Sequence, residues 1–251
     1  MAICKNNFYP EKEVNNICDW IKKYFVENGP NSKAVIGISG GKDSTVAAAL
    51  LVRALGAENV IGVLMPQGEQ SDIDDARWVC DILNIKKYEI NIQDTCDALY
   101  RSLPYDLEVF NDRVFTNTPS RIRMTILYAI AAIVGGRVAN TCNRSEDYVG
   151  YSTKYGDLAG DFGVLNHYCV SQIIEIGDYL DLPEELIHKT PSDGMCGKTD
   201  EDNLGFSYKE LDAFILKGII PKYDKYKNIM EKYNNNKHKR NIYIPAPLLK
   251  P

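Results

Sequence analysis

The sequence has no C-x-x-C pair, although it contains seven cysteines. The ligand spacing of a structural zinc site is therefore absent, and an odd number of cysteines suits free thiols in a reducing compartment. A cysteine outside disulfides and metal sites usually behaves as a small buried hydrophobic side chain. We expect that role for the cysteines here.

Long apolar runs are also missing. The longest candidate, Met124 to Val134, follows two arginines and is shorter than the roughly 20 residues that a membrane helix needs. The first six residues carry no apolar segment of the kind found in secretion signals. We therefore predict a soluble, cytoplasmic protein that has no contact with a membrane.

An excess of positive charge is absent as well, because 34 Asp and Glu residues outnumber 29 Lys and Arg residues and give a formal net charge of −5. Broad binding to nucleic acid depends on the neutralisation of phosphates, so we predict no nucleic-acid partner, while a local basic patch stays possible. Apolar residues make up 45% of the chain, enough for a sizeable core. We predict one domain over residues 1–251.

What the sequence does contain is a glycine-rich turn, residues 37–44, between apolar segments at 34–38 and 46–51. A turn between a buried strand and a helix points backbone N–H groups and the positive end of the helix dipole at a ligand above it. Lys42 adds a cation, and Asp43 is explained if a metal ion accompanies a bound anion. The turn therefore predicts a pyrophosphate site that carries Mg²⁺.

The spacing within this turn decides which phosphate-binding motif is present. The P-loop pattern would require a glycine at Ile36 and a hydroxyl at Asp43, and Ser39 breaks the dinucleotide fingerprint. The segment fits S-G-G-x-D-S instead, and so resembles the ATP pyrophosphatases of the adenine nucleotide alpha-hydrolase type. These enzymes use ATP to adenylate a substrate and release pyrophosphate.

Strand and helix patterns alternate through the chain after a first helix that ends at Gly29-Pro30. Apolar patterns predict strands at 33–38, 60–64, 86–92 and 137–141, and helices at 44–55, 72–83, 121–134, 170–180, 207–216 and 221–233. This order indicates an α/β fold, a doubly wound open parallel sheet with helices on both faces. The segments 105–119, 142–163 and 190–205 show little periodicity, and we predict loops there.

The predicted topology places a second acidic residue beside the glycine-rich turn. Ligands of open parallel sheets bind above the carboxyl ends of the strands, where the strand order reverses. The first strand leads into the turn and the fourth leads into 141–146, so we expect these loops to share one crevice. Glu146 would there meet a metal ion also held by Asp43, because Mg²⁺ commonly takes one or two carboxylates with phosphate oxygens and water. Taken alone, Glu146 has a less favoured alternative, a solvated loop charge.

Several segments together resemble a specific family, the ammonia-dependent NAD synthetases, in the family's order and spacing. The matching segments are 39–45 in and after the glycine-rich turn, 120–124, Thr141 with Glu146, 153–157, 199–205 and 238–240. The turn alone is common to all ATP pyrophosphatases. The segment Lys154-Tyr155-Gly156-Asp157 combined with His238-Lys239-Arg240 is far more specific.

The resemblance implies roles for individual residues and a homodimer, with the substrate near the subunit interface. It implies that ATP is held by Gly37, Ile38, Ser39, Gly40, Gly41, Lys42, Asp43, Ser44, Thr141 and Ser192. It implies that deamido-NAD is held by Arg121, Lys154, Asp161, His238 and Lys239, and that Mg²⁺ is held by Asp43 and Glu146. Asp43, Lys154 and Asp157 are the expected catalytic residues, with Asp157 a candidate for handling ammonium.

One position departs from the family's pattern. Val170 stands where the family often has a lysine that reaches the ATP phosphates. Lys189 or Lys198 is a candidate to supply the missing charge.

The resemblance implies a reaction in two steps. The nicotinate carboxylate attacks the α-phosphorus of ATP and displaces pyrophosphate, and ammonia then attacks the adenylated carboxylate to give NAD and AMP. A carboxylate such as Asp157 could bind ammonium and accept its proton. Because the sequence holds no glutaminase domain, free ammonia or a separate partner is the expected nitrogen source.

Two alternatives stay open at this point. Another ATP pyrophosphatase, such as a tRNA-modifying enzyme, would want a basic RNA-binding domain or catalytic cysteines, which the composition disfavours. A non-catalytic nucleotide-binding module on the same scaffold would not need to keep both Asp43 and Glu146, and fold alone does not separate the two.

Overall fold

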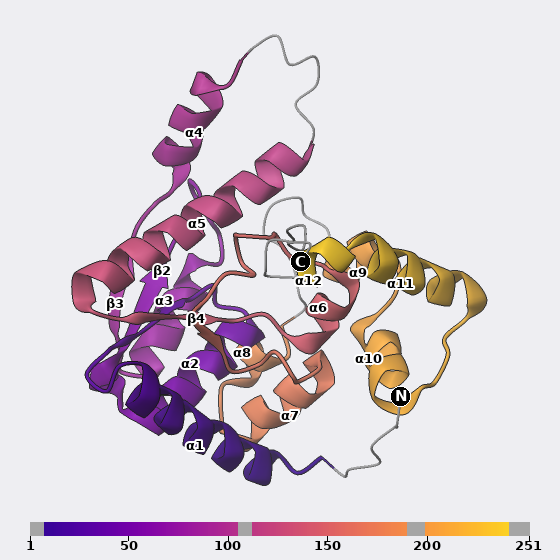
Figure 1. The fold of residues 1–251 in the computed structure, drawn as a ribbon, viewed down its shortest axis with the longest axis horizontal. Coiled ribbons are helices and arrows are strands. Elements are labelled where there is room, and N and C mark those ends of the chain that lie inside the picture. Colours follow the sequence, from indigo (N-terminus) through magenta and orange to yellow (C-terminus); the bar gives the residue numbers. More distant parts are fainter. Residues whose placement is uncertain (1–7, 105–111, 190–198, 241–251) are drawn as a thin grey trace, which may run out of the picture.

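The computed structural model describes residues 8–104, 112–189 and 199–240, and within them a five-stranded sheet is the centre of the fold (Figure 1). All neighbouring strands are parallel, in the order β3-β2-β1-β4-β5. The strands are β1 (Ala34–Gly37), β2 (Val60–Leu64), β3 (Lys86–Glu89), β4 (Arg137–Asn140) and β5 (Phe162–Gly163).

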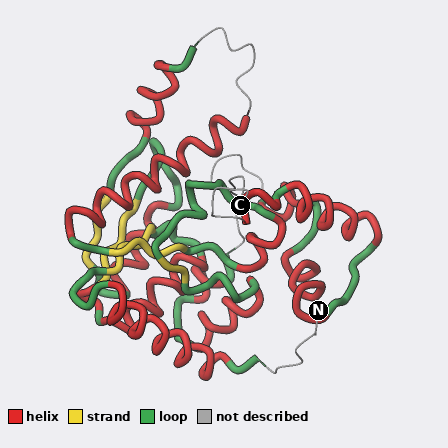
Figure 2. Tube along the Cα trace, in the orientation of Figure 1, coloured by secondary structure: helices red, strands yellow, loops and turns green. Residues whose placement is uncertain are grey.

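Helices cover both faces of this sheet (Figure 2). The helices are α1 (Pro10–Asn28), α2 (Lys42–Leu55), α3 (Ile73–Ile82), α4 (Gln93–Ser102), α5 (Asp112–Val134), α6 (Arg144–Val149), α7 (Val170–Tyr179), α8 (Glu184–Ile187), α9 (Asp200–Leu204), α10 (Tyr208–Lys217), α11 (Tyr223–Asn235) and α12 (Lys237–Arg240), with a short 3-10 turn at Ala57–Asn59. Helices α1, α2, α3, α7 and α8 pack on one face, while α4 and α5 pack on the other. The predicted doubly wound α/β fold is confirmed.

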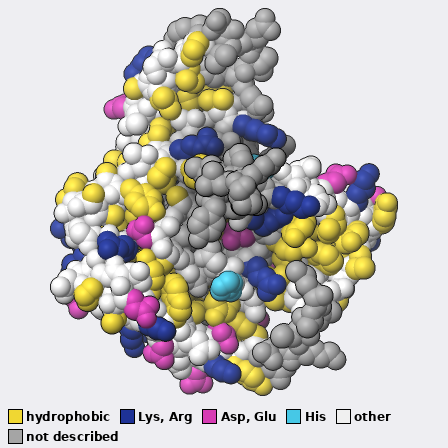
Figure 3. Space-filling model, in the orientation of Figure 1, with side chains coloured by type: hydrophobic (Ala, Val, Ile, Leu, Met, Phe, Trp, Pro, Cys, Tyr) yellow, Lys and Arg dark blue, Asp and Glu magenta, His cyan; other side chains and the backbone are white. Residues whose placement is uncertain are grey.

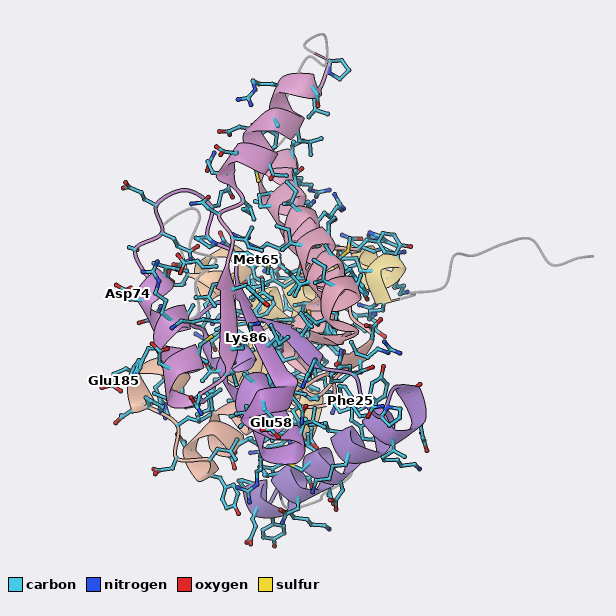
Figure 4. All side chains as sticks on the ribbon, turned by 90° about the vertical axis from the view of Figure 1, so that its left-hand side faces the viewer. Phe25, Glu58, Met65, Asp74, Lys86 and Glu185 are labelled. Atoms are coloured by element: carbon cyan, nitrogen blue, oxygen red, sulfur yellow. The ribbon has the colours of Figure 1, made fainter. Side chains whose placement is uncertain are left out.

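The alternation of side chains along β1 explains why both faces need cover. Ala34 and Ile36 belong to the core beneath α1 and α2, whereas Val35 belongs to the core beneath α5, and all three side chains are fully buried. A central parallel strand that is apolar on both sides is stable only between two helical layers. Strand β3 is instead the sheet edge in front in Figure 4, where Lys86 lies, and its residues are mostly exposed.

A smaller apolar core lies beside the sheet, among helices α6, α7, α9, α10 and α11. Its buried members are Val149, Val170, Leu204, Phe206, Tyr208, Leu211 and Ile229. Residues on both sides of the predicted loop at 190–205 thus join one cluster. This cluster brings the C-terminal third of the chain against the loops that follow β1 and β4.

The prediction of a loop at 105–119 is wrong for its second half, because α5 already begins at Asp112. Pro119 lies inside that helix, where a missing N–H and a ring clash usually cost about 3 kcal/mol. Packing against α4 offsets part of this cost, since the ring of Phe115 lies 5.1 Å from the ring of Tyr100 and such a pair is worth about 0.5–1.5 kcal/mol. Residues 105–111 lie outside the described residues.

Two further loop predictions are also corrected. The segment 142–163 contains α6 and β5, and 190–205 contains α9, while residues 190–198 lie outside the described part of the chain. These elements have two to six residues, which is too short for a hydrophobic period to show. Helix α11 is not the last one either, because the short helix α12 follows it.

The strand order places the carboxyl ends of β1 and β4 side by side. The chain runs from β1 outward through β2 to β3, and then returns to the other side of β1 as β4. The order therefore reverses between β1 and β4, where open α/β sheets bind their ligands. The glycine-rich turn and the segment 141–146 meet at this point, as the sequence predicts.

Within the described ranges, no helix is both long enough and apolar enough to cross a membrane.

Ser207 and Glu210 form a capping box at the start of α10, and this motif generates a test of stability. Ser207 Oγ accepts from Glu210 N, Glu210 Oε2 accepts from Ser207 N, and Lys225 Nζ lies 2.7 Å from both carboxylate oxygens. The Lys225 ammonium and the Ser207 backbone lower the pKa of Glu210 from 4.5 to about 2.

We predict that Glu210→Gln lowers the free energy of unfolding by about 1 kcal/mol at pH 7, a value that allows for partial exposure of the pair. Because the folded-state pKa is depressed, this stabilisation is present above pH 4.5 and is lost as the pH falls towards about 2. Urea unfolding of both proteins between pH 7 and pH 3.5 measures the difference. Glu231→Gln, which removes a 3.9 Å exposed pair with Lys227, is the control. A difference that does not shrink with falling pH would contradict the assignment.

Candidate functional site

The glycine-rich turn joins β1 to α2, and hydrogen bonds from hydroxyl groups in and next to the turn fix its conformation. Ser44 Oγ and Thr45 Oγ1 donate to Gly41 O at 3.1 and 2.8 Å, and the hydroxyls of Ser39 and Ser44 lie 3.1 Å apart. These bonds fix the turn at the N-terminus of a 14-residue helix. The geometry suits an anion, because the helix N-terminus carries unpaired N–H groups and partial positive charge.

Gly40 is the position in this turn that admits no other residue. Its φ of +78° lies in the left-handed region, and a Cβ there would lie 2.7 Å from Asp75 Cβ and 2.8 Å from Ala76 N at the start of α3. Lys189 pairs with the same part of α3, at 2.6 Å from Asp75 and 3.2 Å from Asp72. The lysine is thus adjacent to the turn, and two carboxylates already neutralise it.

Lys42 is the buried cation of the site, with 6% of its surface exposed. Its Nζ lies 3.1 Å from Asp43 Oδ2 and 5.7 Å from the centre of the Tyr208 ring. Burial by itself lowers the pKa of Lys42, but the carboxylates of Asp43, Glu146 and Asp200 outweigh it and raise the pKa above its usual value. Lys42 therefore stays charged inside the protein.

Glu146 lies in the first turn of α6 and is brought to Asp43 by Asn143. The Asn143 side chain accepts from Glu146 N at 2.9 Å and donates through Nδ2 to Asp43 Oδ1 at 3.2 Å, while Asn143 N donates to Glu146 Oε2 at 3.3 Å. Burial of its carboxylate, followed by the charge of Asp43, raises the pKa of Glu146 well above its usual range. A bound cation would relieve both effects. Asn143 therefore links the two acidic residues, and the expectation that they hold a metal ion together stays a prediction.

The resemblance implies a Mg²⁺ ion, for which the side chains of Asp43 and Glu146 offer carboxylate oxygens. No group of three or more His, Cys, Asp or Glu side chains suited to a metal ion occurs in the described part of the chain. Asp43 and Glu146 form a pair of oxygen donors beside an anion-binding turn, which fits a hard ion that takes its other ligands from phosphate and water. It does not fit a closed structural metal site.

Asp157 and Lys154 are presented by the loop between α6 and β5. Asp157 Oδ1 accepts from Ser120 Oγ at 2.6 Å and from Thr153 N at 2.8 Å, which ties the loop to α5. Lys154 Nζ donates to His238 O at 2.8 Å, and Arg121 Nε donates to Lys154 O at 3.4 Å. The structure therefore brings together Arg121, Lys154, Asp157 and His238, which the sequence predicts to act together. In Figure 3, Lys and Arg side chains gather on this face between α5 and α12.

Other predicted site residues lie elsewhere or are already engaged. Thr141 directly follows β4 and is partly buried. Lys239 Nζ donates to the carbonyls of Gly150 and Ser152, both at 2.8 Å. Asp161 accepts from Val138 N at 2.7 Å and from Tyr128 Oη at 3.4 Å, so its carboxylate is bonded to β4 and α5. Ser192 and Lys198 lie outside the described residues.

Val170 occupies an apolar setting in this chain. It is 5% exposed, belongs to the smaller core and donates its N–H to Ser145 Oγ at 3.2 Å. A valine here completes the packing between α7 and the C-terminal helices. Its side chain supplies no charge to the site.

Two functional candidates were missed by sequence reasoning. Asp200, 9% exposed at the start of α9, contributes to the field around Lys42, and Tyr208 places its ring near the Lys42 ammonium. Tyr208 and Asp200 are also joined by a 3.4 Å hydrogen bond. No pattern in the sequence connects these two residues with Lys42, because both lie more than 150 positions from it. A capping box at Thr199 marks the start of the helix that carries Asp200.

We predict that Gly40→Ala weakens ATP binding by at least about tenfold, because the added Cβ must displace α3 from the turn and strain the backbone. Calorimetric titration with Mg²⁺ and ATP measures the affinity. Gly135→Ala is the matched control, since Gly135 also has a positive φ of +65° but no atom within 4 Å of a built Cβ. Equal affinities for the two variants would show that the close approach of α3 does not shape the site.

Comparison with known proteins agrees with this geometry. Residues 13–243 match the family described as NAD synthase. The chain is 38% identical to the NH(3)-dependent NAD(+) synthetase of Thermoplasma acidophilum over 239 residues, which covers 92% of this chain and 95% of the relative. It is 36% identical to the NH(3)-dependent NAD(+) synthetase of Pyrococcus furiosus over 248 residues, with 93% of each chain covered.

Solved structures show the same fold. The NMN synthetase of Francisella tularensis has a TM-score of 0.88 and 33% identity, covering 96% of this chain and 100% of that one. The NH3-dependent NAD synthetase of Campylobacter jejuni, in complex with the nitrate ion, has a TM-score of 0.78 and 29% identity, covering 97% and 100%. The turn, the paired carboxylates and these matches agree, and the chain belongs to the NAD synthase family of amide-forming ligases.

Proposed function

We propose that this protein amidates deamido-NAD with ammonia, at the expense of ATP, to give NAD, AMP and pyrophosphate. The observation that carries the proposal is the pair Asp43 and Glu146, joined through Asn143 beside the glycine-rich turn. A non-catalytic module would have no need to bury Glu146 close to a second carboxylate, an arrangement that disfavours its charged form. The family match supports the same reaction.

ATP would be bound by the turn and by residues around it. The N–H groups at the start of α2 and the Lys42 ammonium would meet the phosphates, with Thr141 at the end of β4 close to the nucleotide. Asp43 and Glu146 would hold Mg²⁺, which when bound neutralises charge on the leaving pyrophosphate. Ser192 stays a predicted ATP contact.

The acceptor would lie beyond the phosphates, against Arg121 and Lys154. Their cationic groups would hold the acceptor's anionic groups close to the α-phosphorus, and positioning of this kind accounts for much of the rate of two-substrate reactions. The nicotinate oxygen forms a bond to the α-phosphorus as the bond to pyrophosphate breaks. His238 and Lys239 keep a proposed role in acceptor binding. For Lys239 that role would compete with its bonds to Gly150 and Ser152.

Asp157 would handle ammonium. Its Oδ1 is held by Ser120 and Thr153, so the carboxylate has a fixed position, and its charge acts on Glu146. It would bind the cation and accept one proton, so that ammonia attacks the adenylated carbonyl carbon and AMP leaves with the oxygen. General-base catalysis of this kind typically contributes about 10²–10⁴-fold to a rate.

We also propose a homodimer that works in the cytoplasm. Val26 near the end of α1 is 71% exposed and Ile133 near the end of α5 is 78% exposed. A hydrogen bond of 3.0 Å from Arg137 Nε to Asn28 O joins the chain just after each of them, and burial of these two side chains would be one gain of dimerisation. The buried free thiols of the described cysteines suit a reducing compartment.

A second acceptor, nicotinate mononucleotide, is favoured by a specific observation. The NMN synthetase of Francisella tularensis has a TM-score of 0.88 with this chain, which exceeds the 0.78 of the NAD synthetase from Campylobacter jejuni. In addition, Asp161, which the resemblance assigns to deamido-NAD, is committed to Val138 and Tyr128. The mononucleotide lacks the adenylate half that such a residue would serve.

The main proposal predicts matched amounts of NAD, AMP and pyrophosphate from ATP, Mg²⁺, deamido-NAD and ammonium chloride. Asp43→Ala should lower this turnover by about 10²-fold or more, because charge on the leaving group is no longer neutralised. Asp74→Ala, at the exposed Asp74 on α3 labelled in Figure 4, is the control. Pyrophosphate release that ignores the nicotinate substrate would favour another ATP pyrophosphatase.

We predict that kcat/KM is at least about tenfold higher for deamido-NAD than for nicotinate mononucleotide. Initial rates with each acceptor at saturating ATP and ammonia measure the ratio. Asp161→Asn should raise KM for the dinucleotide alone if Asp161 contacts its adenylate half. The reverse preference, together with an Asp161→Asn effect that is equal for both acceptors, would identify an NMN synthetase instead.

A further inference from the structure

The last described residues of the chain bind the carbonyl groups of the substrate loop, residues 148–154. Asn236 Nδ2 donates to Val149 O at 2.9 Å, Lys239 Nζ donates to Gly150 O and Ser152 O at 2.8 Å, and Arg240 Nη1 donates to Tyr148 O at 3.0 Å. Three side chains therefore bond four carbonyls within a stretch of five residues. In Figure 1, α12 lies beside α6.

These donors pair with carbonyl groups at the end of α6. Helix α6 ends at Val149, and the last carbonyls of a helix have no partner within it. Gly150 ends the helix with a φ of +68°, and a Cβ at this position would collide with the Asn236 side chain. The close approach of α11 and α12 therefore depends on the glycine, and the basic tail supplies the hydrogen bonds that α6 lacks.

Arg240 joins three elements at once. Its Nη2 donates to Tyr233 O at 2.6 Å, and its guanidinium lies 4.1 Å from the centre of the Tyr233 ring. The ring of Tyr233 lies 4.8 Å from that of Tyr148 on α6. Because a guanidinium is a planar fork with several donors, it bonds two carbonyls while its flat face stacks on a ring, whereas a lysine ammonium has no planar face to stack.

The loop returns a contact to the tail, since Lys154 Nζ donates to His238 O at 2.8 Å. The segment held in this way begins on α6, which carries Glu146 in its first turn, and ends at Lys154. Both residues belong to the proposed active site. Among the described residues, Arg240 donates to the carbonyls of Tyr148 and Tyr233, and neither of these belongs to the glycine-rich turn.

We propose that Arg240 is a positioning residue that holds α6 and the substrate loop in the geometry needed by Glu146 and Lys154, without touching the substrates. The kinetic part of this inference rests on the proposed function. Its structural part does not. The tail then acts as a clamp, closed by Asn236 and Lys239 on either side of Gly150.

Hydrogen–deuterium exchange of the substrate-free full chain tests the clamp without any activity. We expect amides of residues 148–156 to exchange about tenfold faster in Arg240→Gln, with β1 and α2 unchanged. Arg240→Lys should give a smaller acceleration, because the ammonium keeps the charge and can still bond a carbonyl but loses the flat stacking of the guanidinium on the Tyr233 ring. Lys227→Gln, at an exposed lysine on the preceding helix α11, should leave the exchange of the loop amides unchanged.

Steady-state kinetics then test the consequence for the site. Arg240→Gln should raise KM for the nicotinate acceptor by about tenfold, and the Mg²⁺ concentration that gives the half-maximal rate by about the same factor. Its kcat should change less than about threefold. Arg240→Lys should recover part of the loss. Unchanged loop exchange, or equal acceleration throughout the chain, overturns the proposal. A fall in kcat with KM unchanged also overturns it. If the unaltered protein does not turn over deamido-NAD or nicotinate mononucleotide, the proposed function fails while the exchange experiment still decides the clamp.

Discussion

The buried ammonium of Lys42 and the carboxylates around it are the interaction on which the site depends. Burial opposes the charge on Lys42, and Asp43, Glu146 and Asp200 restore it. Three carboxylates against one ammonium leave negative charge in a place poorly reached by water, which is why the pKa of Glu146 is raised. A buried charge cluster of this kind is costly unless it is completed by further partners. We infer that the missing partners are a metal ion and nucleotide phosphates.

The topology of the sheet makes this cluster possible. Strand β1 lies between β2 and β4, so the turn after β1 and helix α6 after β4 emerge at one edge. The smaller core among α6, α7, α9, α10 and α11 then brings Asp200 and Tyr208 over the turn. Val170 takes part in this core with its side chain buried, so it contributes packing and no charge to the site. The ammonium of Lys189 beside Gly40 is paired with Asp72 and Asp75, and its part in phosphate binding stays a prediction.

The basic tail shows how one segment can have two roles. His238-Lys239-Arg240 matches the family's pattern and was expected to hold the acceptor. In the structure, Lys239 and Arg240 bond carbonyls of the loop that also carries Lys154. Hydrogen bonds from charged donors to such carbonyls are worth more than neutral ones, about 1.5–3 kcal/mol each. The tail therefore contributes to the shape of the site.

The sequence by itself determined the α/β class, the parallel sheet, the glycine-rich turn and the pairing of Asp43 with Glu146. Each of these follows from local patterns, namely apolar periodicity, strand–turn–helix order and motif spacing. The tertiary structure alone decided that residues 112–119 are helical despite Pro119 and that Asp200 and Tyr208 surround Lys42. It also decided that Asp161 is bonded to β4 and that Arg240 is turned towards α6. These features depend on contacts between residues far apart in the chain, and a one-dimensional pattern carries no record of which distant groups burial brings together.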